Sequence, residues 1–113
     1  MSRILLVEAN KELHRITPLC LPRHEVTAFF RVAPALKAVE SAQEPFDLAV
    51  IHETLQMSGD GRKFARRLHE HHPKMKIIVL YDFHRESEQG IRYIPAYKWC
   101  QYLISKIVER ELL

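Results

Sequence analysis

The chain has 113 residues, of which 47% are hydrophobic and 27% are charged, and its formal net charge is +3. This length suits one domain with a single core, and we place that domain at residues 1–113. No apolar stretch is long enough to span a membrane, and the first apolar run is too short for a signal peptide. Cys20 and Cys100 form no metal-binding or disulfide pattern, so we expect a cytoplasmic protein.

The first half of the chain alternates apolar runs with segments of helical period. Strands are predicted over residues 4–7 and 25–30, each followed by a helix. The apolar positions of these two helices are Leu13, Ile16 and Cys20 in the first and Ala35, Leu36 and Val39 in the second. Pro18 and Pro22 are expected to shorten or end the first helix, whereas Pro34 suits the first turn of the second.

The second half begins with a strand over residues 48–51 and a helix that starts after Gly59-Asp60-Gly61 and closes before Pro73. Further strands are predicted over residues 77–80 and 91–95. The link between them, residues 82–90, is shorter than a helical crossover normally requires, so we expect a loop or a single turn. The last helix is marked by Trp99, Tyr102, Leu103, Ile107 and Val108.

Strands that alternate with helices predict a parallel sheet with right-handed crossovers. Several segments then resemble the receiver domain of bacterial response regulators, over essentially the whole chain. These are RILLVEAN at residues 3–10, PFDLAVIH at 45–52, GDG at 59–61, IIVLY at 77–81 and YIPA at 93–96. The resemblance implies an α/β fold of the flavodoxin-like type. It is a three-layer sandwich with helices on both faces of a five-stranded parallel sheet of order 2-1-3-4-5, here with the fourth helix shortened or missing.

The resemblance also implies where a phosphorylation pocket would lie. Receiver phosphorylation, as the family performs it, requires an acceptor aspartate, acidic ligands for Mg²⁺, a small hydroxyl residue and a lysine. The matching positions here are Glu8, Ala9, His52, Tyr81 and Ala96. An imidazole forms no acyl phosphate, and one carboxylate is a poor Mg²⁺ site. We therefore expect a degenerate pocket with no catalytic residue, no metal and no cofactor.

Two alternatives at this pocket stay open. Counting back from Gly61 places Glu53 at the acceptor position, although strand alternation directs it away from His52. His52 and Glu8 are also able to pair, which would raise the pKa of the histidine. The domain would then be a still-switchable receiver or carry an enzyme-like site at this corner.

Other signals point to partners rather than to chemistry. His69 and His72 have a spacing that suits a metal, but no further ligand completes a site. The basic residues Arg62, Lys63, Arg66 and Arg67 are interpreted as a solvated helix face, and a nucleic-acid contact through them is the weaker alternative.

The aromatic residues near the last helix are Tyr93, Tyr97, Trp99 and Tyr102. If the fourth helix is missing, this face and the edge of the fifth strand are expected to be uncovered, unless the link over residues 82–90 covers them. The sequence therefore predicts an atypical receiver in two-component signalling. Such a domain would bind a signalling protein, its own output domain or a second copy, with no membrane contact.

Overall fold

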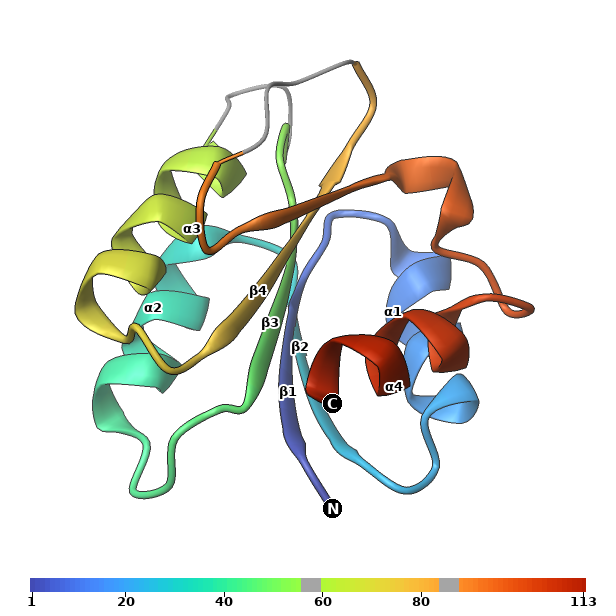
Figure 1. Cartoon of the computed structure of the whole chain (residues 1–113), viewed down its shortest axis with the longest axis horizontal. Coiled ribbons are helices and arrows are strands. Elements are labelled where there is room, and N and C mark those ends of the chain that lie inside the picture. Colours follow the sequence, from blue (N-terminus) through green and yellow to red (C-terminus); the bar gives the residue numbers. More distant parts are fainter. Residues whose placement is uncertain (56–59, 84–87) are drawn as a thin grey trace.

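A computed structural model describes residues 1–55, 60–83 and 88–113 of the chain. Its centre is a five-stranded parallel sheet of order β2-β1-β3-β4-β5 (Figure 1), which confirms the predicted sheet. The strands are β1 (Arg3–Val7), β2 (Glu25–Phe29), β3 (Leu48–His52), β4 (Lys76–Tyr81) and β5 (Arg92–Pro95). Branched apolar side chains fill β1, β3 and β4 because both faces of these central strands are covered.

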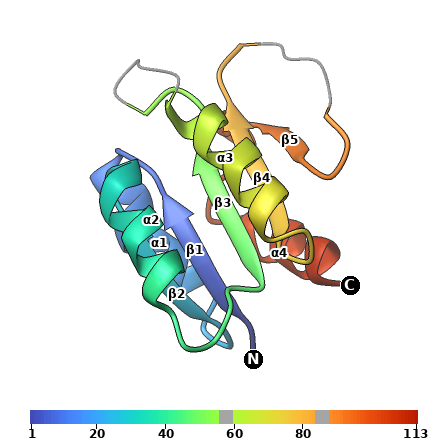
Figure 2. The ribbon, with the colours of Figure 1, turned by 90° about the vertical axis from the view of Figure 1, so that its left-hand side faces the viewer.

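Helices form a layer on each side of the sheet, so the predicted three-layer fold is confirmed (Figures 1 and 2). The helices are α1 (Lys11–Cys20), α2 (Val32–Ser41), α3 (Asp60–His71) and α4 (Ile104–Leu112), with a short 3-10 helix η1 (Ala96–Lys98). Alternate strand residues pack against α2 and α3 on one face and against α1 and α4 on the other. None of the helices in the described ranges is long and apolar enough to cross a membrane.

One helix boundary agrees with the sequence prediction in part, because α1 ends before Pro22, and another differs from it. Helix α1 continues through Pro18 and ends at Cys20, where the Leu21 N–H donates to the Pro18 carbonyl. Helix α4 begins at Ile104, not near Trp99. Trp99 instead lies in the core, where its indole N–H donates to the Thr17 hydroxyl over 3.1 Å. This contact with α1 holds Trp99 ahead of the helix, and helical periodicity alone does not reveal it.

The connection between β4 and β5 contains no helix among its described residues, which are Asp82, Phe83 and 88–91. Residues 84–87 lie outside the described part of the chain. Glu88 and Ile91 form an isolated bridge, and Gly90 has a φ of 85°. A side chain at Gly90 would collide with the His69 ring, so only glycine fits this turn. The predicted shortening of the fourth helix is confirmed to this extent.

Candidate functional site

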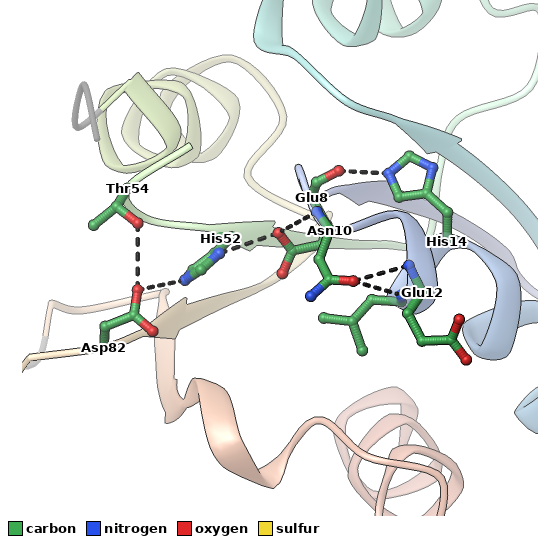
Figure 3. A network of polar contacts seen from close by, with 8 residues as sticks. Glu8, Asn10, Glu12, His14, His52, Thr54 and Asp82 are labelled. Atoms are coloured by element: carbon green, nitrogen blue, oxygen red, sulfur yellow. Dashed lines mark hydrogen bonds and ion pairs between the residues drawn. The ribbon is translucent and has the colours of Figure 1, made fainter. Parts of the chain in front are cut away.

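A cluster of polar side chains lies at the carboxyl edge of the sheet (Figure 3). Glu8 follows β1, His52 ends β3, and Asp82 follows β4. Because β1 and β4 both pair with β3 in parallel, their carboxyl ends meet at one edge. Glu8 is held there by its own backbone N–H, which donates to the Phe29 carbonyl over 3.0 Å.

The His52 ring lies between two carboxylates. Its Nδ1 is 3.1 Å from Glu8 Oε2, and its Nε2 is 2.7 Å from Asp82 Oδ2. The Thr54 hydroxyl donates to the same Asp82 oxygen over 3.3 Å. We call Glu8, His52, Thr54 and Asp82 the His52 cluster. A ring that contacts an acceptor at each nitrogen donates from both, and this is the protonated form of histidine.

The surroundings of His52 favour that charge. Its pKa rises to about 9, chiefly because of the hydrogen bond to Glu8 and to a smaller extent because of Asp82. These two contributions outweigh burial, which lowers the pKa. The side chains of His52 and Glu8 are only 18% and 3% exposed. The contact between Glu8 and His52 is therefore the pairing that the sequence predicted, and it acts on the pKa of the histidine in the expected direction. At neutral pH the ring carries a positive charge between its two acids.

The N-cap residue and the first turn of α1 orient Glu8. The Asn10 side chain caps the helix by accepting from the backbone N–H groups of Glu12 and Leu13. The Asn10 N–H donates to Glu8 Oε2 over 3.2 Å. His14 contacts the Glu8 carbonyl through Nε2 and stacks on Phe30 with ring centres 3.8 Å apart. The acid that holds His52 is thus fixed by a helix N-terminus.

The structure does not bring all five predicted pocket positions together. The side chains of Glu8 and His52 are in contact. Tyr81, in contrast, lies on the α3 side of the sheet, with its ring centre 6.4 Å from that of Tyr93. Ala9 packs against the core beneath α2 and α3, whereas Ala96 packs against the core beneath α1 and α4. Only two of the predicted positions therefore form the polar cluster.

Glu53, the alternative acceptor position, is buried at 1% exposure beside the start of α3. Its backbone N–H donates to the Leu80 carbonyl over 2.9 Å. A Cβ at Gly61 would lie 1.9 Å from the His52 carbonyl oxygen, so glycine is required where α3 packs on the end of β3. The third helix therefore closes tightly over this strand end.

Sequence reasoning missed Asp82, the second carboxylate at His52. A usable signal was its place directly after the fourth strand, at the same sheet edge as Glu8 and His52. Asp82 is the first residue of the link between the predicted fourth and fifth strands, and only the shortness of that link entered the prediction. Asp82 and His52 are 30 residues apart in the sequence, and a contact at this separation cannot be predicted from local spacing.

A second ionic group fixes the other end of the same connection. The Glu88 carboxylate accepts from the Arg66 guanidinium over 3.0 to 3.2 Å and from the Tyr93 hydroxyl over 2.7 Å. Arg62 lies 3.6 Å from the same carboxylate. We call Arg62, Arg66, Glu88 and Tyr93 the Glu88 cluster. Two of the four basic residues noted in the sequence thus hold the β4–β5 connection on α3.

The predicted aromatic face is smaller than expected. Tyr97 and Tyr102 are 80% and 81% exposed. Trp99 is 2% exposed, so its inclusion in a surface cluster was wrong, because its ring fills the core beside Thr17. Tyr93 is half-buried beneath Glu88, which means that the connection covers this part of β5. Within the described ranges, no group of three or more histidine, cysteine, aspartate or glutamate residues is arranged to hold a metal.

A groove lies on the other side of β5, between that strand and α4. Its volume is about 900 Å³, with Ile94, Leu103 and Ile107 among its apolar residues. Lys98, Lys106 and Arg110 also line it. The groove and the two exposed tyrosines together form the region where the sequence predicted a partner.

Comparison with known proteins gives the fold a clear precedent. No protein-family model and no curated protein matches the sequence. Among solved structures, the BeF3-activated DrrB receiver domain matches with a TM-score of 0.78 and 19% identity, over 99% of this chain and 97% of that one. A receiver domain protein from Methanospirillum hungatei JF-1 matches with a TM-score of 0.77 and 19% identity, over 99% and 94%.

A response regulator from Thermotoga maritima has a TM-score of 0.76 at 13% identity, and the match covers 99% of this chain and 98% of that one. Identities this low carry information on fold and not on the chemistry of individual residues. The order of the strands, the layers and the full-length matches agree. The chain therefore has the flavodoxin-like fold of response regulator receiver domains.

Proposed function

We propose that this domain is an atypical receiver of two-component signalling that accepts no phosphoryl group at the usual position and acts by binding a protein. One observation carries the proposal. The side chain at the acceptor position is His52, and both of its ring nitrogens contact carboxylates, at 3.1 Å from Glu8 and 2.7 Å from Asp82.

The chemistry of phosphoryl transfer supports this interpretation. An acyl phosphate requires a carboxylate at the acceptor position, and His52 has none. A phosphohistidine requires a neutral ring nitrogen with a free lone pair, but a protonated ring that donates twice has no lone pair to offer. The positive charge of His52 also offsets the negative charge of Glu8 and Asp82, which weakens the attraction of this corner for a cation.

Features of the surface support the binding role. Tyr97 and Tyr102 are exposed large side chains on one segment, and exposed aromatic groups are enriched at protein interfaces. The neighbouring groove between β5 and α4 adds apolar area beside an edge strand. We infer a signalling protein, an output domain or a second copy as the occupant. We place this action in the cytoplasm, because Cys20 and Cys100 are both free thiols.

The test is incubation with acetyl phosphate and Mg²⁺, followed by intact-mass measurement. A receiver with an acceptor aspartate is treated in parallel to show that the assay detects transfer. We expect no phosphoryl adduct on this domain. An adduct that forms on the wild type would overturn the proposal, and peptide mapping would then distinguish Glu53 from His52 as the site of a still-switchable receiver.

Binding is tested separately by light scattering and by pull-down, with Tyr97→Ala and Tyr102→Ala together as the variant. Both side chains are largely exposed, so the variant is expected to fold normally. We expect loss of the dimer or of the captured partner. A wild-type domain that is monomeric and captures nothing, or a variant that binds equally well, would contradict the assignment of this surface.

A further inference from the structure

The basic charge of the molecule is concentrated in one segment, α3 and the turn into β4. Residues 60–76 contain six lysines or arginines and two acids, a net charge of +4, whereas the whole chain carries +3, so all other residues together carry −1. The segment also contains three of the seven histidines. Figure 2 shows α3 in front of the sheet, on the face that it covers together with α2.

The basic and histidine side chains of this segment differ in their contacts. Arg62 and Arg66 belong to the Glu88 cluster and are occupied there. The side chains of Lys63, Arg67, His71 and Lys74 are exposed and make no hydrogen bond or ion pair with another described residue. Lys63, Arg67 and His71 are spaced one turn apart on the helix, so they form one stripe. We call these four residues the α3 stripe.

A hollow of about 740 Å³ lies at the C-terminal end of the stripe. Lys74 belongs to both the stripe and the wall of this hollow. The remaining wall combines cationic and apolar groups. It includes His69, Pro73, Lys76, Tyr81, Ile91 and Arg92. The acid Glu111 also lines it, but its carboxylate pairs with Arg92 over 2.5 Å.

We propose that the α3 stripe and this hollow together bind an acidic protein segment that carries a large apolar side chain. Carboxylates of the partner pair with the stripe, and the apolar side chain enters the hollow. A nucleic-acid backbone would satisfy the stripe but has no apolar group for the hollow, and the stripe itself carries no aromatic side chain on which a base would stack. This inference rests on the proposed function in one respect, that the domain works by binding a protein.

The site differs from the groove between β5 and α4. Besides the residues at β5 and Glu111, it is built from α3, the turn over residues 73–75 and β4, and the lysines and the arginine of the stripe lie on the α3 side of the molecule. The two surfaces share Arg92 and Tyr93 of β5 and Glu111 of α4, which lie between them. Substitutions in the stripe and in the groove are therefore able to separate the two sites.

The test uses a short synthetic peptide of glutamates around one phenylalanine as the probe, titrated into the isotope-labelled domain and followed by NMR. A peptide with lysines in place of the glutamates and a peptide with glycine in place of the phenylalanine serve as probe controls. We expect saturable shifts at the α3 stripe and at residues 73–76 and 90–92. Binding of each control peptide is expected to be about tenfold weaker.

The matched variants carry the same change of charge on each surface. Lys63→Glu with Arg67→Glu is expected to weaken binding of the acidic peptide by about tenfold, whereas Lys98→Glu with Lys106→Glu is expected to leave it unchanged. Thermal melts of both variants check that each is folded. Equal weakening by both variants, or no saturable binding at all, would overturn the inference.

Two further results would also overturn it. A DNA duplex that binds the same residues more tightly than the peptide at equal salt would reassign the stripe to nucleic acid. Peptide shifts confined to Tyr97, Tyr102 and the β5–α4 groove would reject the α3 site. The second result would leave the proposed function supported, so failure of this inference is distinguishable from failure of that function.

Discussion

The His52 cluster and the Glu88 cluster fix the two ends of the same connection with opposite arrangements of charge. At its start, Asp82 is one of two carboxylates around a single cation. Near its end, Glu88 is a single carboxylate beside two guanidinium groups and a phenol. The first cluster centres on side chains that are 18% and 3% exposed, whereas the Arg66 and Glu88 side chains are 48% and 25% exposed.

This difference in burial determines what each cluster contributes. An ion pair at the surface adds little to stability because water screens it and the side chains lose freedom. A buried pair is different, because removal of one partner leaves the other charge without compensation. We therefore expect both clusters to position the β4–β5 connection, but only the His52 cluster to make a large difference to the free energy of unfolding.

The largest effect is expected from His52→Ala. This change leaves the buried carboxylate of Glu8 without its cation and is expected to lower the free energy of unfolding by about 3 kcal/mol. Chemical denaturation at neutral pH measures it. His71→Ala removes an exposed histidine and serves as the matched control, with an expected change below about 0.5 kcal/mol. Equal effects of the two substitutions would refute the large contribution of the His52 cluster to stability.

The next effect concerns pH. The pKa of His52 is about 9 in the folded chain against an ordinary 6.5. Because the folded value is the higher one, the stabilisation is fully present below pH 6.5 and is lost as the pH rises through 9. We expect the free energy of unfolding to fall by about 3 kcal/mol across this window. NMR titration of the ring measures the pKa directly, and the alkaline loss should be absent from His52→Ala.

The smallest effect is expected from Glu88→Gln, which keeps the shape of the side chain and removes its charge. We expect a loss below about 1 kcal/mol at neutral pH. The hydrogen bond from Arg66 lowers the pKa of Glu88, so its contribution is present above pH 4.5 and disappears as the pH falls through the lowered value. Denaturation curves between neutral and acidic pH test this. A loss as large as that of His52→Ala would reverse the ranking.

The elements that the sequence predicts well are those whose residues repeat a simple pattern. The central strands are continuous apolar runs because both of their faces are buried, and burial of that kind is visible in the residues themselves. The pairing of Glu8 with His52 was also predictable, since each comes at the end of a parallel strand. In both cases position along a strand determines the contact.

The features that escaped prediction depend on contacts between distant residues. Trp99 lies in the core ahead of α4, where it is bonded to Thr17, 82 positions earlier in the chain. Tyr93 is covered because Glu88, Arg66 and the turn at Gly90 lie beside it. Helical or strand periodicity does not predict contacts of this kind. The irregular part of the chain was thus the part that local patterns could not describe.

The buried position of Trp99 has a practical consequence. It is the only tryptophan in the chain, its ring is 2% exposed, and its N–H is bonded to Thr17. Its fluorescence therefore reports on the packing between α1 and the segment before α4, without any attached dye. Unfolding moves the ring into water and shifts the emission to longer wavelength, so the molecule contains its own optical probe for the stability measurements above.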